Sequence, residues 1–128
     1  MSVRDELRKA TLGTKVEFRK KVVNYNGKVF EIRQPSVKSR SELFKRCTDD
    51  KGKVDLMNFL TWSVIFNTYV PDDAKDADGN PSPDAGKLVF EEGDYATLVE
   101  KPAGGFMDQF GEIASELLNV NEDSVGKK

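Results

Sequence analysis

The stretch VDLMNFLTWSVIFNTYV, residues 54–70, holds the only tryptophan of the chain, Trp62, within a run of large apolar side chains. Its apolar residues recur with the spacing of an α-helix, and Asp55 and Pro71 are placed to cap its start and to end it. The expected stripe consists of Leu56, Phe59, Leu60, Ser63, Phe66 and Val70, widened by Met57, Ile65 and Tyr69. Because apolar residues occupy more than one face, we predict a central, largely buried helix. The alternative is a strand near Trp62–Phe66, although strands seldom run as long as this stretch.

The composition excludes several classes of protein. A length of 128 residues predicts one domain, and a net charge of -2 argues against a dedicated nucleic-acid binder. The single cysteine, Cys47, excludes an internal disulfide and favours an intracellular compartment. The absence of histidine removes His-based catalysis and His-containing metal sites. We therefore expect no enzyme and no cofactor, and neither a signal peptide nor a membrane span is visible.

The N-terminal third predicts a short helix and a β-hairpin. Ser2 suggests a helix start and Gly13 its end, with Val3, Leu7 and Ala10 on one face of a short docking or fraying helix. Residues 15–33 then form a hairpin around the turn signal Asn26-Gly27. A two-residue loop scatters the apolar residues over both faces, so the hydrophobic pattern favours a three-residue loop, Tyr25-Asn26-Gly27. That register pairs Val22 with Phe30, places Lys21 opposite Glu31, and gathers one apolar face made of Val16, Phe18, Val22, Phe30 and Ile32.

The middle of the chain predicts one further helix and one loop. Ser39 to Glu42 fits a capping box that opens a short helix, on which Cys47 is a small core residue. The acidic loop Asp72–Gly86 has the wrong spacing for a calcium site, because the twelfth position from Asp76 is Lys87. We expect a mobile, solvated loop and no metal.

The C-terminal part predicts an extended segment, a short helix and a long amphipathic helix. Leu88-Val89-Phe90 is extended, Asp94 is a candidate N-cap of a helix within Glu91–Glu100, and FMDQFGEIASELLNV from residue 106 is amphipathic. An excess of large apolar residues in this part suggests a partner-binding surface made of Leu98, Val99, Phe106, Met107 and Phe110.

These elements define an α+β fold: a small, mostly helical domain with an N-terminal β-hairpin packed on the central helix. Residues 1–120 form a single domain, and residues 121–128 form a polar tail that we expect to be disordered.

Several stretches resemble the tail assembly chaperones of long, flexible-tailed bacteriophages (siphoviruses). They are TWSVIFNTYV at 61–70, KLVFEEGDYATLVEK at 87–101, FMDQFGEIASELL at 106–118 and RKKVVNYNGKVFEIRQPSVKSRSELF at 19–44. The pattern F-x-x-x-D-x-x-x-L, here Phe90, Asp94 and Leu98, is similar to that of the family. The likeness covers most of residues 14–120, and the Asp72–Gly86 loop departs from it by its richness in proline.

The resemblance implies a protein of the host cytoplasm that is absent from the mature virion. Such chaperones coat the long helical tape measure protein, keep it soluble, help to recruit tail tube subunits and self-associate into spirals or other oligomers. They are often made in two forms by programmed frameshifting, and the ending Gly126-Lys127-Lys128 can be encoded by a slippery run of adenines. The alternative function is a virion structural component, such as a tail terminator or minor tail protein.

Overall fold

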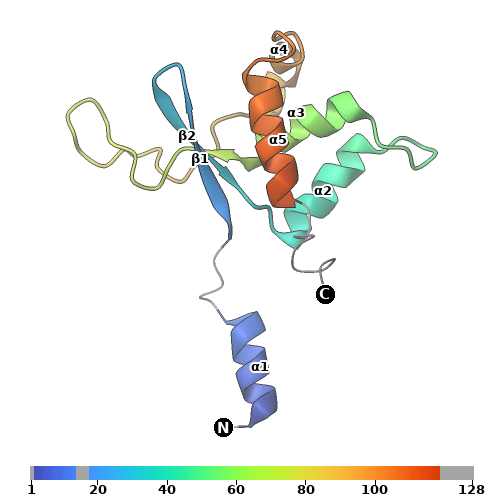
Figure 1. The fold of residues 1–128 in the computed structure, drawn as a ribbon, viewed down its shortest axis with the longest axis vertical. Coiled ribbons are helices and arrows are strands. Elements are labelled where there is room, and N and C mark those ends of the chain that lie inside the picture. The colour runs from blue at the N-terminus through green and yellow to red at the C-terminus, as the bar shows by residue number, and fades with distance from the viewer. Residues whose placement is uncertain (1, 14–17, 119–128) are drawn as a thin grey trace.

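A computed structural model describes residues 2–13 and 18–118 of the chain. Its helices are α1 (Val3–Leu12), α2 (Val37–Cys47), α3 (Leu56–Asn67), α4 (Tyr95–Leu98) and α5 (Phe106–Leu118), with a 3-10 turn, η1 (Glu92–Asp94), just before α4. The strands β1 (Lys20–Tyr25), β2 (Lys28–Arg33) and β3 (Thr68–Tyr69) form one antiparallel sheet in the order β1-β2-β3 (Figure 1). The predicted α+β fold with an N-terminal hairpin is confirmed. The tail 121–128, with its expected disorder, lies outside the described residues.

The central helix forms as predicted, so the alternative strand near Trp62–Phe66 is wrong. Its N-cap is Asp55, whose carboxylate accepts a hydrogen bond of 2.9 Å from the backbone N–H of Asn58. The helix ends at Asn67 rather than at Val70, because Thr68 and Tyr69 leave it to pair with β2. Those two residues connect the helix to the sheet.

Burial along α3 differs from the expected stripe. Val64 and Ile65 in the second half are fully buried, whereas Leu56 and Met57 at the start are exposed by 79% and 55%. The first turn of α3 projects past the core, and its apolar side chains therefore do not contribute to it.

The hairpin has the two-residue loop that the hydrophobic pattern disfavoured. Asn26 and Gly27 have φ angles of 52° and 74°, so both central residues take the left-handed conformation of a type I′ turn. Val22 consequently pairs with Glu31 and Val23 with Phe30. The predicted register was wrong because it assumed that one face carries all the apolar residues, and the turn chemistry overrides that assumption.

This register distributes apolar residues over both faces of the hairpin. Val23 and Ile32 are buried on the face that meets α5, while Tyr25 and Phe30 pack at its edge. Phe18, Val22 and Val29 lie on the other face and are exposed by 56%, 57% and 50%. Val16, also assigned to the apolar face, lies outside the described residues.

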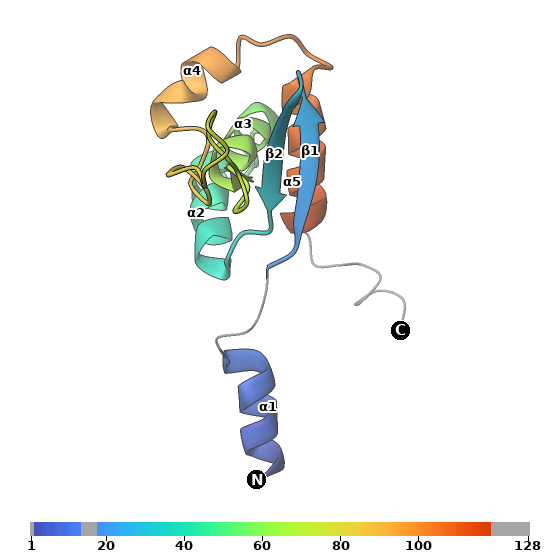
Figure 2. The same cartoon turned by 90° about the vertical axis from the view of Figure 1, so that its left-hand side faces the viewer.

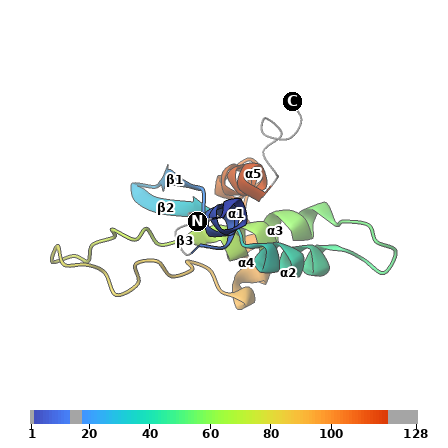
Figure 3. The same cartoon turned by 90° about the horizontal axis from the view of Figure 1, so that it is seen from below.

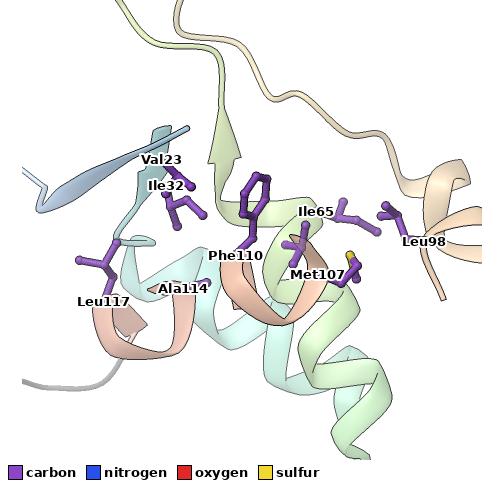
Figure 4. Close-up of a cluster of buried hydrophobic side chains, with 9 residues drawn as sticks. Val23, Ile32, Ile65, Leu98, Met107, Phe110, Ala114 and Leu117 are labelled. Carbon is purple, nitrogen blue, oxygen red and sulfur yellow. The ribbon is translucent and has the colours of Figure 1, made fainter. Parts of the chain in front are cut away.

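The core lies between the hairpin, α3 and α5. Figure 4 shows Phe110 of α5 between Ile32 of the sheet and Ile65 of α3, and Phe110 is completely buried. A second cluster joins Leu43 and Cys47 of α2 to Leu118 of α5, with Phe59, Trp62 and Phe66 packed against it. The expectation that Cys47 is a core residue is confirmed, since its side chain is 1% exposed.

Two capping predictions were wrong in their details. The helix α2 begins earlier than expected, with Ser36 as N-cap accepting from the backbone N–H of Ser39. Asp94 is the N-cap residue of α4, as expected, but its carboxylate forms no capping hydrogen bond to that helix and instead accepts one of 2.8 Å from the backbone N–H of Glu91. In both places a polar side chain just upstream of the expected cap starts the turn, so the boundary moves toward the N-terminus.

Residues 70–87 form an excursion that leaves the sheet and returns to it. Val70 N–H donates to the Lys87 carbonyl and Gly86 N–H to the Val70 carbonyl, which closes the base of the excursion. At its tip, the Asp76 carboxylate accepts from the backbone N–H groups of Asp78 and Asn80. Figure 3 shows the excursion projecting away from the helices, and most of its residues are exposed, as expected for a solvated loop.

The N-terminal helix lies apart from this core. Figures 1 and 2 show α1 beyond the start of β1, and none of its residues is buried. Its N-cap is Ser2 and its C-cap is Gly13, as the sequence predicts. The helix is well capped but has no surface to pack on.

Candidate partner-binding surface

The five residues predicted to bind a partner contribute mainly to the core. Leu98, Met107 and Phe110 are exposed by 4%, 5% and 0%, so the expectation that they stay partly exposed was wrong. Val99 and Phe106 are partly buried, and Phe106 packs against the core. The apolar excess in this region is explained by α5, which needs a full apolar face to cover both the hairpin and α3.

A small cleft does lie beside three of those residues. Leu98, Val99 and Met107 line a hollow of about 150 Å³ together with Met57 and Leu60 of α3. The exposed first turn of α3 forms its border. This hollow is too small for a helix or strand of another protein.

A larger groove lies between α2, α3 and the segment that enters η1. Its volume is about 700 Å³, and it is lined by Lys38, Ser39, Glu42, Arg46, Ile65, Phe66, Tyr69, Leu88, Phe90, Glu91 and Glu92. Ile65, Phe66 and Phe90 are apolar lining residues, and Leu88 is exposed by 46%. The charged residues come from α2 on one side and from residues 91 and 92 on the other. We call this the α2–η1 groove.

Backbone pairing explains why residues 88–92 form one wall of the α2–η1 groove. Leu88 bridges to Tyr69, and the Val89 N–H donates to the Thr68 carbonyl at 3.0 Å. The hydrogen bond from the Glu91 N–H to Asp94 then turns the chain into η1. The sequence signal for this wall is the short run Leu88-Val89-Phe90 followed by two acids. That run alone predicts an extended segment and does not indicate a groove.

Arg46 joins the two sides of the groove. Its guanidinium lies 4.6 Å from the centroid of the Trp62 ring and 5.3 Å from that of Phe66, and it forms an ion pair with Glu92. Stacking on two aromatic rings fixes the guanidinium, so that η1 is held opposite α2. The groove is therefore a preformed feature of the fold.

No cluster of metal ligands accompanies the groove in the described part of the chain. Within residues 2–13 and 18–118, no group of three or more acidic, cysteine or histidine side chains is placed to hold a metal ion. The buried thiol of Cys47 is unreactive, because burial and then the charge of Asp55 raise its pKa to about 11. None of the helices in the described part of the chain is long and apolar enough to cross a membrane. The groove has an apolar floor and charged edges, a combination that suits the binding of another polypeptide.

Comparison with known proteins gives one match, over most of this chain. No protein-family model matches the sequence, and no curated protein matches it. Among solved structures, that of the bacteriophage HK97 tail assembly chaperone is similar over 93% of this chain and 100% of that chain, with a TM-score of 0.45 and 18% sequence identity.

Proposed function

We propose that this chain is a non-catalytic assembly chaperone of a phage tail, which binds the tape measure protein and keeps it soluble in the host cytoplasm. The proposal begins from the sequence resemblance carried by Phe90, Asp94 and Leu98. Phe90 lines the α2–η1 groove, Asp94 holds the turn that ends the groove wall, and Leu98 anchors the following helix in the core. The motif thus supports one wall of the groove that we propose as the binding site.

The observation that carries the proposal is the α2–η1 groove itself. Its apolar lining, near Phe66, Leu88 and Phe90, suits the apolar stripe of an amphipathic helix, and its charged borders suit the polar flanks of that helix. The resemblance implies a tape measure protein that is long and helical. Covering its apolar stripe would remove the surface through which an unassembled tape measure protein aggregates.

The remaining roles follow from the resemblance. Tail tube subunits are recruited through a longer form of the protein, made by programmed frameshifting. Copies of the chaperone self-associate, so that one tape measure protein is covered along its length. The chaperone leaves when the tail is complete and is absent from the virion.

Co-expression with the tape measure protein of the same genome tests the proposal. The wild-type chain should raise the soluble fraction of the tape measure protein. Leu88→Asp places a charge on an exposed groove residue and should abolish that gain without changing the melting temperature. Leu56→Asp, at the exposed start of α3 and outside the groove, is the matched control and should behave as wild type.

Two results would contradict the proposal. If the tape measure protein is equally insoluble with and without this chain, the chaperone role fails. If Leu88→Asp and Leu56→Asp act alike, the groove is not the binding site. Mass spectrometry of purified virions addresses the alternative, because a tail terminator or minor tail protein would be present there in stoichiometric amounts.

A further inference from the structure

The hairpin has one largely uncovered face. Phe18, Val22 and Val29 lie on the side opposite α5, and each is at least half exposed. Two shallow hollows of about 310 Å³ and 300 Å³ lie along this face, and both include Lys20, Glu31 and Asp72. A sheet that is apolar on both faces normally has a layer on each. Within residues 2–13 and 18–118, a helix covers only one of these faces, and that helix is α5.

The polar groups of this uncovered face are already satisfied. Glu31 is 3% exposed, and its carboxylate pairs with Arg33 at 3.0 Å and with Lys20 at 3.5 Å. Arg33 also pairs with Asp72 at 3.0 Å. This network fixes the side chains beside Val22 and Val29 without a partner. What remains open on the face is apolar surface, with the exposed carboxylates of Asp72 and Asp73 at its edge.

The helix α1 also carries an uncovered apolar face. Val3, Leu7 and Ala10 share one face, and Val3 and Leu7 are exposed by 71% and 63%. A ten-residue helix is marginal in water unless its apolar face is packed. Figure 2 shows α1 beyond the sheet of its own chain, and the exposure of Val3 and Leu7 shows that no described residue covers its apolar stripe.

Charges beside the two surfaces are complementary. Arg4 and Arg8, one turn apart, lie on the same side of the α1 stripe, and neither forms an ion pair within the described part of the chain. On the sheet, the hollow beside Val22 and Val29 is bordered by Lys20, which pairs with Glu31, and by two exposed acids. Asp72 keeps an exposed carboxylate beside its pair with Arg33, and Asp73 forms no ion pair in the described part of the chain. Lengths also agree: α1 is about 15 Å long, and a six-residue strand is about 20 Å long.

From these observations we infer that α1 of one copy docks on the uncovered hairpin face of a second copy. Val3 and Leu7 cover Phe18, Val22 and Val29, and Arg4 and Arg8 face Asp72 and Asp73. The inference rests on the proposed self-association and gives it a specific contact. Because donor and acceptor are different surfaces of one chain, the contact is heterologous and can repeat without closing.

A complementation experiment separates donor from acceptor. Leu7→Asp disables the donor helix, and the double variant Val22→Lys/Val29→Lys disables the acceptor face by adding positive charge opposite Arg4 and Arg8. All three positions are exposed, so circular dichroism and melting temperature should match wild type. Light scattering after size-exclusion chromatography should show concentration-dependent association of wild type and monomers of each variant. An equimolar mixture of the two variants should form a one-to-one pair, because each supplies the surface that the other lacks.

Several outcomes would overturn the inference. They are a Leu7→Asp chain that associates as wild type does, a mixture of variants that stays monomeric, and a wild-type chain that is itself monomeric because α1 folds back on its own hairpin. Leu88→Asp in the α2–η1 groove is the control and should associate normally. If the variants complement each other while wild type leaves the tape measure protein insoluble, the inference stands and the proposed function fails.

Discussion

Gly111 lets α5 pack directly on Leu60 of α3. A Cβ atom at this position would lie 2.0 Å from Leu60 Cδ1 and 3.4 Å from its Cγ. Alanine is favoured over glycine inside a helix by roughly 1 kcal/mol, but overpacking costs roughly 1–3 kcal/mol. The atom in the way is the end of a flexible side chain, so Leu60 can relieve part of the clash. We expect Gly111→Ala to lower the free energy of unfolding by about 0–2 kcal/mol in urea denaturation, the difference between the two effects.

A double-mutant cycle checks this explanation. In a Leu60→Ala background the obstructing side chain is gone, so Gly111→Ala should become neutral or stabilising. If the two substitutions are simply additive, the contact between these residues is not what requires glycine.

Cys47 provides a residue-scale test of the second core cluster. The thiol is 1% exposed, and burial followed by the charge of Asp55 raises its pKa to about 11. At pH 8 iodoacetamide should therefore modify the unfolded chain within minutes and leave the folded chain unmodified, as judged by mass. The raised pKa also makes the stability of the fold depend on pH. The stabilisation gained by keeping the Cys47 thiol protonated is complete below about pH 9 and is lost as the pH rises through about 11. Rapid labelling of the folded chain would show that α2 opens readily from α5.

At the scale of elements, the hairpin turn decides which residues face the core. In the type I′ turn, Asn26 has a φ of 52°, which only Asn, Asp and Gly adopt readily. Asn26→Ala should therefore cost about 1 kcal/mol, while Asn26→Gly should be neutral. In the three-residue loop expected from the pattern, Gly27 is the residue assigned a positive φ, and Asn26→Ala would be harmless. Urea denaturation of the two variants distinguishes the loops.

The sequence could predict α3, its Asp55 cap and the presence of a hairpin, because helical periodicity and an Asn-Gly turn are local signals. It could not predict the register, because the rule that apolar residues share one face fails when a sheet has two apolar faces. Binding by Leu98, Met107 and Phe110 was inferred from apolar excess, which cannot distinguish a core from a surface. The sequence did not predict the α2–η1 groove, because the walls of the groove come from segments far apart in sequence, α2 and Leu88–Glu92.

At the scale of the whole molecule, Arg33 joins three parts of the fold. Its guanidinium pairs with Glu31 on the hairpin and with Asp72 at the base of the excursion, and it lies 4.4 Å from the centroid of the Tyr69 ring in β3. Arg33 thus holds the excursion against the uncovered hairpin face. The proposed acceptor surface for α1 depends on that arrangement, since Asp72 and Asp73 border it.

Replacing Arg33 should therefore have a large effect that replacing Lys20 does not. Arg33→Met leaves the buried carboxylate of Glu31 with only Lys20, whose side chain is 53% exposed, and should cost about 3 kcal/mol. Lys20→Met, the control, removes an exposed cation and should cost less than about 1 kcal/mol. Adding Glu31→Leu to Arg33→Met should recover most of the loss, because no unpaired charge then stays buried.

Amide hydrogen exchange adds a local readout: Arg33→Met should speed exchange at Val70 and Gly86, whose N–H groups close the base of the excursion. If both single variants unfold at the same urea concentration, the ion network is a surface feature, and Arg33 does not set the position of the excursion.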